Sequence, residues 1–174
     1  AKTGNVITLS ITSSEAINTP SVSIAGQVVS MVNVTSVDNV TWSATYEMAG
    51  SYSQGSVSLN IVFSDLAGNA GSTVTSTTDV SVVRFDSIAP ELDNVTIASN
   101  NSVSTLAKTG DNITLSITSS EAIQTPTVRI AGQNATETGD NITWSATYEM
   151  AGSYSQGSVS LNIVFSDLAG NAGS

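Results

Sequence analysis

The side chains best suited to chemistry in this chain are acidic and amide groups in a turn that occurs twice. The segment Ser-Asp-Leu-Ala-Gly-Asn occupies residues 64–69 and again residues 166–171. Carboxylate, amide and backbone oxygens are the ligands of calcium, which takes roughly six to eight of them and tolerates flexible loops. The same letters also suit a purely structural turn, because Asp bonds its own backbone and Gly-Asn tolerates left-handed conformations.

The expected order of strands brings more acidic residues to the same place. In a β-sandwich of roughly seven strands, the turns after the second and sixth strands lie at the end where the chain enters. Carboxylates that converge there repel one another unless a cation neutralises them. The sequence therefore predicts a structural Ca²⁺ site at the junction between two repeats, formed by Asp86, Glu91, Glu121, Asp167 and Asn171. A weaker site, without an incoming linker, is predicted from Glu15, Asp65 and Asn69.

Composition argues against other chemistry. The chain has no His and no Cys, so it offers no His-based triad, thiol nucleophile or disulfide. The two lysines, Lys2 and Lys108, stand in turn-like segments, and the acidic residues sit in turns that imply no cleft for a glycosidase. We therefore predict that the chain is not an enzyme. Its net charge of −10 disfavours nucleic acid, and no apolar run approaches the ~20 residues of a membrane span.

The elements that position these residues follow from an internal repeat. Residues 41–72 and 143–174 are identical, and residues 1–27 closely match residues 107–133. The first copy is longer between Val28 and Val40, which indicates a surface hairpin there. The repeat is roughly one hundred residues long, the size of an immunoglobulin-like sandwich.

Apolar and polar residues alternate along several segments, which is typical of half-buried strands. Strands are predicted around Ile7–Ile11, Val22–Ile24, Val40–Met48, Val57–Phe63, Ser72–Phe85 and Leu92–Ala98. Trp42 and Trp144 lie on the apolar phase and are expected in the cores. The sequence thus predicts an all-β chain of two tandem immunoglobulin-like Greek-key β-sandwich domains.

Each predicted domain is one strand short. Residues 1–86 form the first repeat without a first strand, and residues 87–174 form the second repeat without a last strand. Either the chain is an internal piece of a longer protein, or neighbouring chains supply the strands by edge addition. We expect the first of these arrangements.

Three motifs carry a resemblance to a known family. Ile-Ala-Pro at 88–90, Ser-Ser-Glu-Ala at 13–16 and 119–122, and Asp-Leu-Ala-Gly-Asn at 65–69 and 167–171 resemble tandem bacterial immunoglobulin-like repeats. Such repeats occur in large surface adhesins and biofilm proteins. The resemblance implies an extracellular, cell-surface spacer whose partners are neighbouring repeats, with calcium at the domain junctions.

Two alternatives remain open. The chain could be a subunit of an extracellular or phage-associated filament that assembles by strand exchange between chains. It could also be a ligand-binding module that uses the loops at one end of the sandwich, with Tyr52, Tyr154 and the variable hairpin as contacts.

Overall fold

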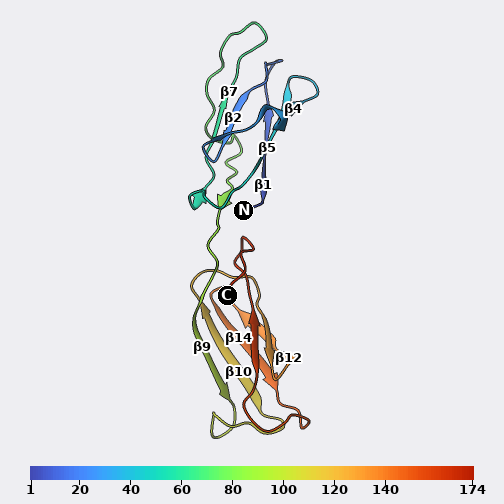
Figure 1. The fold of residues 1–174 in the computed structure, drawn as a ribbon, viewed down its shortest axis with the longest axis vertical. Helices are drawn as coiled ribbons and strands as arrows, with labels where there is room; N and C mark the ends of the chain where they lie inside the picture. The colour runs from blue at the N-terminus through green and yellow to red at the C-terminus, as the bar shows by residue number, and fades with distance from the viewer. The chain divides into compact units, whose positions relative to one another are not determined.

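The computed structural model describes all residues from 1 to 174, which separate into two units, Ala1–Ser87 and Ile88–Ser174. Figure 1 shows that strands make up both units, and the one helical element is the short 3-10 helix η1 (Met31–Asn33). No helix is long and apolar enough to cross a membrane. The all-β fold predicted from the sequence is confirmed.

The second unit consists of two antiparallel sheets. The first has the order β13–β14–β10–β9, built from β9 (Leu92–Ser99), β10 (Asn112–Ser119), β13 (Thr136–Gly139) and β14 (Thr143–Glu149). The second has the order β12–β11–β15, built from β11 (Thr127–Ile130), β12 (Gln133–Asn134) and β15 (Leu161–Val164).

Alternation along the strands places one face of each sheet in a shared core. Ile113, Leu115 and Ile117 of β10 are buried together with Val128 and Ile130 of β11. The residues between them, such as Ser116, point to the other face of the sheet. Two sheets with one apolar face each therefore enclose a single core, as expected for an immunoglobulin-like β-sandwich.

The first unit repeats this plan with a smaller first sheet. Its sheets have the orders β1–β5–β4 and β3–β2–β7, and β6 pairs with β8. The strands are β1 (Val6–Thr12), β2 (Ser21–Ile24), β3 (Gln27–Val28), β4 (Val34–Ser36), β5 (Thr41–Glu47), β6 (Gly55–Ser56), β7 (Leu59–Val62) and β8 (Arg84–Phe85). No strand pairs with the edge of β1 that faces away from β5.

The two tryptophans lie in the cores, as predicted. Trp42 and Trp144 are each 6% exposed and belong to the apolar cluster of their own unit. The buried Nε1 atom of each indole has no hydrogen-bond partner. The rings thus contribute apolar burial, at the cost of an unsatisfied donor.

The predicted strand over Ser72–Phe85 is wrong for most of its length. Only β8 is a strand within it, and Val74 forms an isolated bridge with Ile61. A turn interrupts the segment, because Asp79 Oδ1 accepts hydrogen bonds from the Ser81 amide at 3.1 Å and its hydroxyl at 2.7 Å. Val80, between them, has a left-handed φ of 57°, which a continuous strand does not allow.

The variable connection is exposed in both units. In the first unit it contains η1 and β4, and the side chains of Met31, Val32 and Val37 are open to solvent. In the second unit the shorter connection forms β13, which pairs with β14. The length difference between the repeats therefore falls in a surface hairpin, as predicted.

Candidate metal site

The turn at residues 166–171 holds its acidic residue through its own backbone. Asp167 Oδ1 accepts hydrogen bonds from the amides of Gly170 at 2.6 Å and Asn171 at 2.8 Å. The amide of Asp167 donates to the Asn171 carbonyl at 3.1 Å, which closes the turn. Gly170 has a φ of 91°, a conformation that favours glycine. The local sequence therefore fixes the direction of the Asp167 side chain.

Glu121 lies in the loop that follows β10. The Ser119 hydroxyl donates to the Glu121 carbonyl at 2.6 Å and to the Ile142 carbonyl at 3.1 Å, which fixes the start of this loop. Ile123 then forms an antiparallel bridge with Asp167. The bridge joins the loop to the turn, so Glu121 and Asp167 belong to one end of the second unit.

The segment between β8 and β9 carries Asp86 and Glu91. Its end is held against the loop after β10, because the Ser120 amide donates to the Glu91 carbonyl at 2.9 Å and the Glu91 amide donates to the Ser120 hydroxyl at 3.0 Å. Pro90, just before, is fully buried. This segment therefore enters the second unit beside Glu121.

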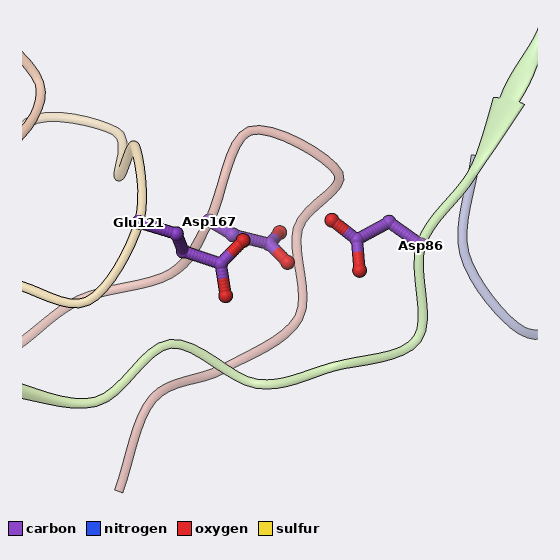
Figure 2. Close-up of side chains that lie close together, drawn as sticks. All are labelled: Asp86, Glu121 and Asp167. Atoms are coloured by element: carbon purple, nitrogen blue, oxygen red, sulfur yellow. The ribbon is translucent and has the colours of Figure 1, made fainter. Parts of the chain in front are cut away.

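Three carboxylates gather at this point. One oxygen each of Asp86, Glu121 and Asp167 lies within 4.8 Å of the others, and Figure 2 shows the three side chains close together. Asp167 is 1% exposed, and the other two residues are partly buried. Two unit charges about 4 Å apart repel by about 4 kcal/mol at an effective dielectric constant of about 20. A hard divalent cation relieves such repulsion, and the donor set of three carboxylates suits calcium.

Two further predicted ligands take different places. Glu91 is exposed and does not belong to the carboxylate group, although its backbone anchors the entering segment. Asn171 donates from Nδ2 to Asp167 Oδ2 at 2.7 Å. Its side chain therefore orients the Asp167 carboxylate.

The first unit contains the same turn but no cluster of three carboxylates. Asp65 Oδ1 accepts from the Asn69 amide at 2.8 Å, and Asp65 Oδ2 accepts from Asn69 Nδ2 at 2.7 Å. The side-chain hydrogen bond from Asn69, followed by that from its amide, holds the pKa of Asp65 below its usual value. Glu15 is exposed, and no third carboxylate joins these residues to form a metal-binding group.

Two polar residues that help to position the carboxylate cluster were not predicted from the sequence. Ser120 anchors the entering segment, and Gln124 donates from Nε2 to the Asp167 carbonyl at 3.0 Å. In the first unit Asn18 makes the equivalent bond to the Asp65 carbonyl at 2.6 Å. The available signal was that both copies keep an amide side chain at this position.

The tyrosines suggested as ligand contacts bond to other tyrosines. The Tyr148 and Tyr154 hydroxyls are 2.5 Å apart, and the Tyr46 and Tyr52 hydroxyls form the equivalent bond. The rings of Tyr148 and Tyr154 meet edge to face at 6.3 Å. Each pair joins β5 or β14 to the loop that follows it.

Comparison with known proteins gives a match to a solved structure. No family model matches the chain, and no curated protein matches it. The structure of the Clostridium thermocellum CbhA fibronectin(III)-like modules is similar with a TM-score of 0.41 and 15% identity, over 99% of this chain and 83% of that one. At this level the likeness carries no argument about function.

Proposed function

We propose that this chain is a structural spacer from a large bacterial cell-surface adhesin, and that calcium stiffens the connection between its repeats. The proposal includes an extracellular location and no enzymatic activity. The observation that carries it is the convergence of Asp86, Glu121 and Asp167 where the connecting segment enters the second unit.

The repeat itself supports a spacer. Residues 41–72 and 143–174 are identical, although each copy belongs to a different unit. A chain that extends by repeating one sandwich keeps each core independent, so that length is gained without redesigning the fold. The net charge of −10 keeps such a chain soluble and favours cations over anionic partners.

Calcium gives the carboxylate group its mechanical role. A cation held by Asp86 together with Glu121 and Asp167 ties the connecting segment to the second unit. Without the cation, repulsion among the three carboxylates favours their separation. Calcium therefore restricts the segment, and an array of such repeats becomes stiffer when calcium is present.

The test is calcium titration of the chain by isothermal calorimetry, with magnesium as the competing ion. We expect saturable calcium binding at one site, weaker magnesium binding, and loss of the calcium signal in Asp86→Asn. Small-angle scattering of the wild type should show a narrower range of dimensions with calcium than after chelation. Absence of calcium binding, or scattering that a chelator leaves unchanged, contradicts the proposal.

A further inference from the structure

The strands β1 and β10 share the sequence Ile-Thr-Leu-Ser-Ile-Thr but not the same neighbours. β10 is paired on both edges, with β14 and β9, whereas β1 pairs only with β5. Ile113, Leu115 and Ile117 are buried, whereas Ile7, Leu9 and Ile11 at the same positions remain partly exposed. The same sequence is therefore buried in the second unit, whereas in the first unit its apolar residues remain partly exposed beside a free strand edge.

The uncovered strand borders a groove. A cavity of about 1130 Å³ in the first unit is lined by β1, β7 and residues 74–83. Its walls include Leu9, Ile11, Phe63, Val82 and Val83. The side chains of Val82 and Val83 are 65% and 41% exposed, so the groove presents apolar side chains to solvent among the polar residues of this segment.

The second unit shows what covers the same strand. There β9 lies antiparallel to β10, with Val95 opposite Ile117 and Ile97 opposite Leu115. Val95 and Ile97 thus lie on the core face of the sheet, yet they are 42% and 47% exposed. Residues 88–174 contain no segment equivalent to residues 74–83, which line the groove in the first unit. The first unit therefore lacks a strand equivalent to β9 beside β1, and the side chains of Val95 and Ile97 in the second unit lack a cover equivalent to residues 74–83.

The free edge of β1 also offers backbone donors. The Ser13 amide donates to Val40 and the Met48 amide donates to Asn5, so the odd-numbered residues of β1 bond toward β5. In an antiparallel ladder the intervening residues bond to the opposite side. The amides of Thr8, Ser10 and Thr12 therefore point to the free edge. In the second unit the equivalent edge is used, since the Asn100 amide donates to Asn112.

We propose that the groove of the first unit binds an extended polypeptide segment whose sequence pattern is that of residues 92–99. The bound segment adds to β1 as an antiparallel strand in the register of β9 on β10. The residue equivalent to Val95 lies opposite Ile11, and the residue equivalent to Ile97 lies opposite Leu9. Backbone hydrogen bonds to the edge provide affinity, and the two apolar side chains entering the groove provide specificity.

Strand binding in this groove requires neither calcium nor a spacer role. The groove belongs to the first unit alone, and none of Asp86, Glu121 and Asp167 lines it. Peptide binding should therefore persist in a chelator. Loss of calcium binding and loss of strand binding are separate results.

A fluorescent peptide with the sequence of residues 90–101 tests the proposal against the full chain by anisotropy. We expect saturable binding at one site, with amide shifts in β1 by nuclear magnetic resonance. Lys at the positions of Val95 and Ile97 should weaken binding by about tenfold or more, because two apolar side chains no longer enter the groove. Lys at the position of Thr96 is the matched control, since this residue faces away from the core, and it should bind like the parent peptide.

The protein variant that completes the test is Ser10→Pro. It removes an edge donor without removing a bond to β5, and proline is tolerated on strand edges. An unchanged thermal transition shows that the variant is folded. We expect its peptide affinity to fall by about tenfold, the effect of about 1.4 kcal/mol.

Three outcomes overturn the proposal. One is the absence of saturable peptide binding, and another is equal binding to the wild type and to folded Ser10→Pro. The third is self-association of the chain that Ser10→Pro abolishes while the peptide does not bind. That result would assign the groove to a second copy of this chain.

Discussion

Asp65 and Asp167 begin identical turns, but only Asp167 is fully buried, with 1% of its surface exposed. Both carboxylates accept the same two hydrogen bonds from the Asn four residues later, so local sequence does not explain the difference. The second turn has Glu121 and Asp86 close to its carboxylate, whereas the first turn belongs to no such group. The different burial of Asp65 and Asp167 therefore comes from residues that are distant in sequence.

The pair allows a matched test of the calcium proposal. At a calcium concentration about 100-fold above Kd, binding should stabilise the wild type by about 2–3 kcal/mol. Asp167→Asn should abolish this gain because it removes a ligand, whereas Asp65→Asn should retain it. Calorimetric melting with calcium and with chelator measures both. If both variants lose the stabilisation by calcium equally, the turn alone accounts for it and the cluster of three carboxylates is not required.

A second matched pair measures the effect of β9. Leu115→Ala should destabilise the second unit by about 2–5 kcal/mol, the usual cost of truncating a buried leucine. Leu9→Ala should cost the first unit about half as much or less, because Leu9 is already partly exposed. Amide hydrogen exchange in denaturant reports on each unit separately. Equal costs would mean that the groove beside β1 is closed in solution.

Asn69→Ala should raise the pKa of Asp65 toward its ordinary value, because the Asn69 side chain makes the largest contribution to lowering it. A carboxyl group with a depressed pKa in the folded state stabilises the fold above its ordinary pKa. That contribution disappears as the pH falls through the depressed value. The variant should therefore be less stable than the wild type at neutral pH and should converge with it in acid. Carboxyl chemical shifts against pH measure the change.

The control for that variant is Asn18→Ala. Its amide donates to the Asp65 carbonyl rather than to the carboxylate. The pKa of Asp65 should stay depressed in this variant. A rise equal to that in Asn69→Ala would attribute the shift to the shape of the turn.

Tyr148→Phe should lower the pKa of Tyr154 toward its ordinary value. The hydrogen bond between the Tyr148 and Tyr154 hydroxyls is the main cause that raises this pKa. A raised pKa means that the contact stabilises the fold below the ordinary tyrosine pKa and loses this effect as the pH rises through the raised value. An ultraviolet absorbance titration measures the change. Tyr52→Phe should have the same effect on Tyr46 in the first unit.

Alternating residues were sufficient to predict most strands. β1, β5 and β9 lie where the patterns of Ile7–Ile11, Val40–Met48 and Leu92–Ala98 placed them. The pattern failed over residues 72–85, because Asp79 makes side-chain bonds that compete with strand pairing. Periodicity measures which face is apolar, and it does not detect such a turn.

The candidate site was predictable only in part. The strand order correctly indicated that the loop of Glu121 and the turn of Asp167 lie together, because Ile123 and Asp167 form a bridge. The strand order did not show that Asp86 joins the carboxylate cluster while Glu91 does not. That difference depends on how the connecting segment is held. Hydrogen bonds between Ser120 and the Glu91 backbone fix that segment and leave the Glu91 side chain exposed.

Identical strands also affect how the chain reaches its fold. β5 and β14 have the same sequence, and their partners β1 and β10 share all the residues that pair with them from Ile7 or Ile113 onward. During refolding, β10 can therefore pair with β5 as favourably as with β14. β9, which has no counterpart in the first unit, does not correct this choice because it binds the other edge of β10. The shorter loop closure within a unit favours the native pairing. Because the alternative pairing occurs within one chain, dilution does not prevent it.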